Sequence, residues 1–141
     1  MLFRSALLAG EPDWIANSAN FAALIYQAVP DLNWAGLYYL QGEELVLGPF
    51  QGKPACVRIA KGKGVCGAAV ATGKTQRVAD VHDFPGHIAC DLASRSELVV
   101  PLYVGVELRG VLDLDSPRPD RFSADDQVGI EQLTKIGRAH V

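Results

Sequence analysis

The sequence contains few cysteines and histidines and has no excess of positive charge. Three cysteines and three histidines occur among 141 residues. An odd and small cysteine count is a poor match to the disulfide framework of a secreted domain. Thirteen Lys and Arg residues stand against sixteen Asp and Glu residues, which gives a net charge of -3. Nucleic acids and anionic membrane surfaces select for basic patches, so we expect neither as a partner.

Long apolar runs are also missing. No run approaches the roughly 18 residues that cross a bilayer, and residues 2–10 lack the three-part pattern of a signal peptide. We therefore expect a cytoplasmic protein, in a compartment that keeps thiols reduced. The length predicts one domain over residues 1–141. Residues 2–5 and 136–141 match translations of sequencing adapters, so we expect the native part to cover about 6–135.

The periodicity of apolar residues predicts an α+β domain. Helices are predicted over 14–29 and 65–72 and after Ser123, which is placed to cap the last of them. Strands are predicted over 33–40, 44–50, 55–60, 76–78, 97–103 and 107–116. Residues 80–94 form a long irregular segment, and such segments in compact domains are usually functional. The order of elements predicts a central antiparallel sheet of about six strands flanked by helices.

The last two predicted strands bring acidic residues together. In an antiparallel pair that turns near Gly105, opposed residue numbers sum to about 211, give or take one. Glu97 then lies across from Asp113 or Asp115, and an even sum places all three carboxylates on one face. Like charges at close range raise at least one pKa, and a neutral carboxyl can donate a proton. A solvated polar sheet face is the alternative.

Cysteine and histidine residues offer two further kinds of site. Cys90 lies in the irregular segment that also holds His82 and His87, where a thiol can have a lowered pKa and react as a thiolate. Cys56, at the start of a predicted strand, and Cys66, in a helix of small residues, fit inert packing as well as chemistry. A zinc site from His82, His87, Cys90 and a second cysteine is a weaker alternative, because this spacing is not a strong finger pattern.

Six segments carry a specific resemblance. They are NWAGLY (33–38), LGPFQGKPAC (47–56), GKGVCG (62–67), GHIACD (86–91), SRSE (94–97) and VLDLDS (111–116). Together they resemble the free methionine-(R)-sulfoxide reductases, which are single GAF domains, over about residues 6–131. The resemblance implies a GAF-like fold and a thiol-dependent reductase that converts free L-methionine-(R)-sulfoxide to methionine. A GAF sensory module that binds a small molecule without catalysis is the alternative function.

The resemblance also implies roles for individual residues. Cys90 matches the catalytic cysteine, Cys56 the main resolving cysteine, and Cys66 a third cysteine that sometimes participates. Acidic and aromatic residues of the substrate pocket are matched by Glu97, Asp113, Asp115, Trp34 and Tyr38. The family needs no bound cofactor or metal, uses an external thioredoxin-like dithiol, and suggests a possible homodimer.

A mechanism follows from these roles. The Cys90 thiolate would attack the sulfoxide sulfur while Glu97 or Asp113 supplies a proton to the oxygen. Asp115 would pair with the substrate ammonium, and Trp34 would pack on the S-methyl group. Cys90 would be left as a sulfenic acid and condense with a second cysteine to a disulfide. Whether Cys56 or Cys66 resolves Cys90 is open at this point.

Overall fold

The computed structural model describes residues 10–88, 90 and 92–138. In the two ends that are predicted to be translated adapter sequence, residues 2–5 and 139–141 lie outside the described residues. The backbone of residues 136–138 continues the last helix. No described helix is both long and apolar enough to cross a membrane.

A six-stranded antiparallel sheet organises the fold. Its order is β3-β2-β1-β6-β5-β4, and every neighbouring pair is antiparallel. The strands are β1 (Trp34–Gln41), β2 (Glu44–Gly52), β3 (Arg58–Ala60), β4 (Gln76–Val78), β5 (Ser96–Val104) and β6 (Glu107–Ser116). The predicted α+β class and the antiparallel sheet are confirmed.

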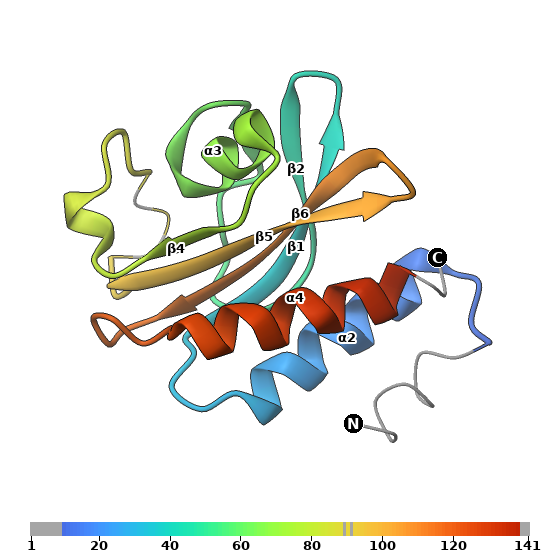
Figure 1. Ribbon diagram of the computed structural model, residues 1–141, viewed down its shortest axis with the longest axis horizontal. Helices are drawn as coiled ribbons and strands as arrows, with labels where there is room; N and C mark the ends of the chain where they lie inside the picture. Colours follow the sequence, from blue (N-terminus) through green and yellow to red (C-terminus); the bar gives the residue numbers. More distant parts are fainter. Residues whose placement is uncertain (1–9, 89, 91, 139–141) are drawn as a thin grey trace.

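Helices cover both faces of this sheet. Helices α2 (Trp14–Ala28) and α4 (Ala124–Arg138) lie side by side against one face, and α3 (Gly64–Thr72) lies on the other (Figure 1). A short 3-10 turn, η1 (Val81–Asp83), follows β4. Ser123 caps α4 as predicted: its hydroxyl accepts from the Asp126 amide at 3.0 Å, and the Asp126 carboxylate accepts from the Ser123 amide at 2.9 Å.

The alternation of side chains along the strands produces two separate cores, one on each face of the sheet. Leu98, Leu112 and Leu114 point toward α2 and α4, where they pack with Ile25 and Ile130. The opposite face packs against α3 and gathers Trp34, Tyr38, Cys66, Val99 and Val111. Successive side chains of a strand point to opposite faces, so residues 97, 113 and 115 belong to the α3 face. The polar residues of the sequence prediction therefore gather on one side of the sheet, while the other side is apolar core.

One predicted strand boundary is wrong. The sequence predicts a strand over 55–60, but β3 begins at Arg58 and Cys56 lies in the segment before it. Pro54 has no amide hydrogen to give to a ladder. The carbonyl oxygens of Lys53 and Cys56 instead accept hydrogen bonds from side chains of β1. Cys56 is therefore held by aromatic side chains rather than by strand pairing.

Candidate active site

A β-bulge decides which way Glu97 points. Near the turn, Tyr103 pairs with Leu108, whereas Leu102 pairs with Gly110, so Arg109 is an extra residue on β6. Beyond this bulge Glu97 lies opposite Asp115. Directly opposed residues share a face of an antiparallel pair, and one residue of slip would turn Glu97 to the other side. The bulge therefore produces the even register that the acidic cluster requires.

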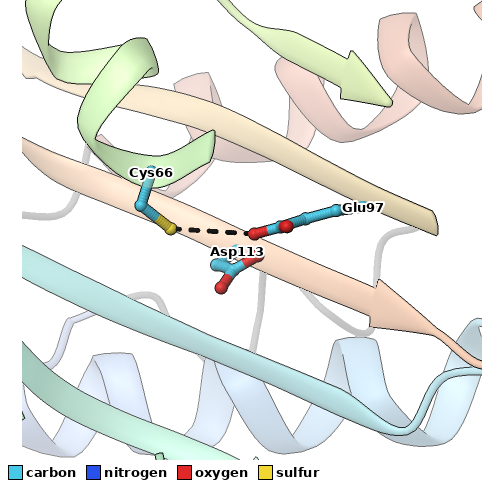
Figure 2. Close-up of side chains that lie close together, drawn as sticks. All are labelled: Cys66, Glu97 and Asp113. Carbon is cyan, nitrogen blue, oxygen red and sulfur yellow. Dashed lines mark hydrogen bonds between the residues drawn. The ribbon is translucent and has the colours of Figure 1, made fainter. Parts of the chain in front are cut away.

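Three buried polar side chains from three elements meet on this face. Cys66 from α3, Glu97 from β5 and Asp113 from β6 place a sulfur and two carboxylate oxygens within 4.8 Å of one another (Figure 2). The Cys66 thiol lies 3.9 Å from Glu97 Oε1, which accepts its weak hydrogen bond. All three residues are buried, whereas Asp115 at the same edge is only half-buried. The predicted acidic cluster is thus a buried group and not a solvated polar surface.

Burial changes the protonation of this cluster. Burial, followed by the charges of Asp113 and Asp115, raises the pKa of Glu97 well above its usual range. Burial also raises the pKa of Asp113, although hydrogen bonds from its neighbours oppose that shift. Two such carboxyls cannot both be charged at this distance without a cation, so at least one carries a proton. Among the described residues, Asp113 Oδ1 has no hydrogen-bond partner, which leaves it available to a ligand.

Cys66 is held as a thiol. Burial raises its pKa well above the usual range, and the carboxyl groups of Asp113 and Glu97 add to the shift. A thiol kept protonated is a poor nucleophile. A cation that displaced its proton could be held by Cys66, Glu97 and Asp113 together, since thiolate and carboxylates are ligands of zinc.

The predicted zinc site from the two histidines is not formed by the described residues. His82 is exposed and contacts Asp80 through Nδ1 at 3.1 Å. His87 lines the cavity, and burial together with His82 lowers its pKa. The sequence predicts both imidazoles beside Cys90. Among the described residues, His87 lines the cavity together with Cys90, and His82 does not.

Cys90 is joined to Cys56 by a disulfide. Their Cα atoms lie 5.6 Å apart, and Cys66 is the free, buried cysteine. Cys90 is exposed at the cavity edge, while Cys56 is half-buried. The disulfide therefore joins the two outer cysteines and leaves the inner one reduced.

A cavity connects the disulfide to the acidic cluster. It holds about 570 Å³ of space when its open mouth is included. Of the eight predicted site residues, all but Cys56 line it: Trp34, Tyr38, Cys66, Cys90, Glu97, Asp113 and Asp115. The prediction missed Ile59, Lys63 and Ser94, which also line the wall. The sequence Gly62-Lys63-Gly64 directly before a helix was the available signal for Lys63.

Aromatic residues of β1 and β2 build one wall and fix the Cys56 segment. Trp34 stacks on Phe50 with ring centroids 5.3 Å apart and on Tyr38 at 5.9 Å. The Trp34 indole donates to the Lys53 carbonyl at 3.0 Å, and the Tyr38 hydroxyl donates to the Cys56 carbonyl at 2.9 Å. Burial and the nearby Asp113 raise the pKa of Tyr38, so its hydroxyl remains a donor.

The two ends of the irregular segment that carries Cys90 are bonded to each other; we call these ends, Asp80 with Val81 and Arg95, its stem. Arg95 Nη2 binds Asp80 Oδ2 at 2.9 Å, and the Val81 amide donates to the Arg95 carbonyl at 2.7 Å. The Arg95 amide in turn donates to the carbonyl of Ser116 on β6. The guanidinium lowers the pKa of Asp80, so this pair stays charged at neutral pH. The two ends of the segment are thereby anchored to the sheet.

Comparison with known proteins agrees with this geometry. The sequence model of the GAF domain matches residues 16–136. A protein of Escherichia coli (strain K12), called free methionine-R-sulfoxide reductase, is 56% identical over 129 residues, which cover 92% of this chain and 78% of that protein. A structure titled as free methionine-R-sulfoxide reductase from Neisseria meningitidis in complex with its substrate is 45% identical, with a TM-score of 0.93. It covers 97% of this chain and 83% of that one.

A second solved structure gives the same result. The reduced form of fRMsr of Staphylococcus aureus is 48% identical, with a TM-score of 0.95 over 97% of this chain and 89% of that one. The family model spans most of the chain, and the identity to the Escherichia coli protein extends over nearly all of it. The chain belongs to the free methionine-R-sulfoxide reductase family of GAF-domain proteins.

Proposed function

We propose that this protein reduces free L-methionine-(R)-sulfoxide to methionine with electrons from an external dithiol. The observation that carries the proposal is the cavity that opens beside the Cys56–Cys90 disulfide and ends on the buried carboxyls of Glu97 and Asp113. A redox-active sulfur and a proton donor then face the same small space. The names of the similar proteins supply the substrate class.

Cys90 is the nucleophile in this proposal. Its exposure at the cavity edge gives substrate access to the sulfur, whereas the raised pKa of Cys66 disfavours a thiolate at the cavity floor. The reduced Cys90 thiolate attacks the sulfoxide sulfur, and the oxygen passes to the enzyme as methionine leaves. Cys90 is oxidised to a sulfenic acid and the substrate sulfur is reduced, so the two-electron change balances.

Glu97 and Asp113 supply the proton that this step needs. Sulfoxide oxygen is a poor leaving group unless it is protonated or strongly hydrogen-bonded, and a neutral buried carboxyl provides that donor. The raised pKa values of both residues keep a proton on the pair near neutral pH. We assign the donor to this pair and not to one member, because the two titrate together.

Recognition of a free amino acid follows from the charges around the cavity. Asp115 is the proposed partner of the substrate ammonium, and a peptide-bound residue has no ammonium there to offer. The substrate carboxylate would lie toward Lys63 and the first turn of α3, where backbone amides carry partial positive charge. Trp34 and Tyr38 form the wall for the S-methyl group, since sulfur packs well against aromatic rings.

Cys56 completes the cycle. Its thiol attacks the sulfur of the Cys90 sulfenic acid, which forms the disulfide and releases the oxygen as water. A thioredoxin-like dithiol then reduces the disulfide, which suits a reducing compartment such as the cytoplasm. The proposal requires no bound cofactor. A homodimer remains a prediction from resemblance.

The test is turnover of free methionine sulfoxide with dithiothreitol, comparing the parent with Cys90→Ser. The parent should form methionine, and Cys90→Ser should lose activity by a factor of about 1000 or more. Both sulfoxide epimers and an N-acetylated substrate complete the assay, and the R epimer of the free amino acid should be preferred. Equal rates for parent and variant would refute the proposal. Tight binding of the sulfoxide with no methionine formed would favour the sensory-module alternative.

A further inference from the structure

Large apolar side chains are exposed around the disulfide. Val57 is 62% exposed, Leu92 is 87% exposed and Ile88 is 39% exposed. Each lies within two residues of Cys56 or Cys90 in the sequence. Single exposed apolar residues are ordinary, but a group of them next to a reactive centre indicates a contact surface. We call Val57, Ile88 and Leu92 the disulfide collar.

The collar is small enough to lie within one protein–protein interface. The Cα atoms of Cys56 and Cys90 are 5.6 Å apart. Adding the chain steps to Val57 and Leu92 at 3.8 Å each, the two Cα atoms of these residues lie within about 17 Å. A standard interface covers roughly 800 Å² on each partner, so one protein surface can contact the whole collar and the disulfide together.

Positive charge borders the collar. Lys53 and Lys63 are exposed, and neither is within ion-pair distance of an acidic group in the part of the chain that the structure describes. Arg58 and Lys61 on the same stretch are paired with acidic residues of the β1–β2 hairpin. Lys53 lies three residues before Cys56 in the sequence, and Lys63 lines the same cavity as Cys90. We call these two lysines the basic rim of the collar.

We propose that the disulfide collar is the docking surface for the protein that re-reduces Cys56–Cys90. The proposal rests on the proposed function, which requires that reduction in every cycle. The partner it fits is a dithiol protein whose reactive thiol lies in an apolar surface bordered by acidic residues, because such a surface complements both the collar and its basic rim.

The chemistry of the docked complex balances. One thiolate of the partner attacks a sulfur of the Cys56–Cys90 disulfide, which forms a mixed disulfide and releases one cysteine as a thiolate. The second partner thiol then attacks the mixed disulfide and releases the other cysteine. Two electrons and two protons pass to this protein, and the partner is left oxidised. Every attacking thiolate must approach the disulfide in line. Docking matters for a protein reductant because its thiol is fixed in a large surface that has to be oriented, whereas a small dithiol reaches the exposed disulfide without a contact surface.

The test measures reduction of the disulfide directly, in the absence of methionine sulfoxide. The oxidised parent and the double variant Val57→Asp/Leu92→Asp are mixed with reduced thioredoxin or with dithiothreitol, and newly formed thiols are alkylated and counted by mass. The variant should react with thioredoxin about tenfold more slowly, as expected for the loss of a contact worth roughly 1.4 kcal/mol. Its rate with dithiothreitol should match that of the parent within about twofold.

Val106→Asp is the control for an apolar-to-acidic substitution away from the disulfide. Val106 is 99% exposed and lies at the β5–β6 turn, at the opposite side of the molecule from the segment after β4 that leads to Cys90 (Figure 1). This variant adds one negative charge and should react with both reductants as the parent does. A double variant that reacts with thioredoxin at the parent rate would overturn the docking surface. Because no substrate is present, this result is independent of whether the protein turns over methionine sulfoxide.

Discussion

The hydroxyl of Tyr38 donates a 2.9 Å hydrogen bond to the backbone carbonyl of Cys56. Tyr38 lines the cavity, so one side chain contacts both the proposed substrate space and the proposed resolving cysteine. The segment around Cys56 is outside any strand, and this bond is one of two that fix it to β1. The position of Cys56 is thereby fixed by a residue of the aromatic wall.

Tyr38→Phe should slow the second thiol step and spare the first. The ring keeps the wall, but the Cys56 carbonyl loses a donor, and a hydrogen bond of about 1 kcal/mol corresponds to roughly fivefold in rate. Trapping of the Cys90 sulfenic acid with dimedone during turnover should increase, while KM for the sulfoxide changes little. Sulfenic acid trapped at the parent level would contradict this role of Tyr38.

Glu97→Gln should remove proton donation while preserving the size and hydrogen bonding of the side chain. Positioned proton transfer contributes about 100-fold or more, so kcat for methionine formation should fall by at least that factor. Methionine released by the parent and variant is measured chromatographically. Glu107→Gln, at an exposed carboxylate on the β5–β6 turn, is the control and should keep the parent rate. A Glu97→Gln enzyme with unchanged kcat would show that Glu97 is not required as the donor, and Asp113→Asn would then show whether Asp113 supplies the proton alone.

The same pair should make folding stability decrease as pH rises. The folded pKa values of Glu97 and Asp113 are raised, so their stabilisation is complete below the unfolded values of about 4 and is lost as pH rises through the folded values. The slope can reach about 1.4 kcal/mol per pH unit for each proton. Urea unfolding of the parent between about pH 5 and pH 8 should show this decrease.

Glu97→Gln should flatten that decrease, because one of the two titrating groups is gone. The lowered pKa of His87 acts in the opposite direction near neutral pH, but it is present in both proteins and cancels in the difference. The lowered pKa values of Asp80 and Asp126 act below this pH window. Parallel stability profiles for parent and variant would show that Glu97 is ionised at neutral pH.

Cys66→Ala should leave the redox cycle in place. The disulfide joins the other two cysteines, and the raised pKa of Cys66 keeps it a thiol. Peptide mapping after one turnover should still find the Cys56–Cys90 disulfide, with a stability loss of about 1 kcal/mol from the smaller side chain. Cys56→Ser should instead leave Cys90 without its partner. A Cys66–Cys90 disulfide in the oxidised parent would reverse the assignment of the two cysteines.

Substitution of Gly110 tests the close packing of β1 and β6 next to the bulge, and substitution of Gly129 on α4 is its control. A Cβ at Gly110 would overlap the Tyr38 carbonyl oxygen and lie 2.9 Å from the Cα of Tyr39, so Gly110→Ala should cost about 3 kcal/mol or more. Gly129 is on α4 with open space where a Cβ would be, and Gly129→Ala should stabilise by roughly 0.5–1 kcal/mol. Urea midpoints give both values. A Gly110→Ala protein of parent stability would mean that β1 and β6 separate easily at the bulge.

Local sequence patterns were sufficient for the elements and for the class of fold. Apolar spacing of 3.6 located α2, and alternation located β5 and β6 within a residue or two, because burial of one face imposes these periods. The cap at Ser123 was also predictable, since it depends only on residues nearby in sequence. Strand β3 was placed too early because the contacts that hold Cys56 come from side chains of a distant strand.

The site was less predictable than the fold, for a geometric reason. The parity of the β5–β6 register depends on one extra residue at Arg109, and nothing in the turn sequence specifies a bulge there. Pairing of Cys56 with Cys90 spans 34 residues and needs the sheet to bring the segment after β2 and the segment before β5 to the same end of its strands. The family resemblance implied the roles of Cys56 and Cys90, which the spacing of the cysteines alone does not. Lys63 was missed because its place at the cavity depends on where α3 packs.

The anchored stem of the segment from Asp80 to Arg95 has an energetic consequence for the catalytic cycle. A cross-link stabilises a fold mainly by restricting the unfolded chain, and the effect grows with the length of the loop it closes. The sulfur–sulfur bond joins residues that are 34 apart in the sequence, which corresponds to about 4 kcal/mol. The ion pair and the backbone bonds between Asp80, Val81 and Arg95 belong to the folded state, so they keep the segment in place when that bond is open. The oxidised protein should therefore melt at a higher temperature than the reduced one, while the reduced protein stays folded between turnovers.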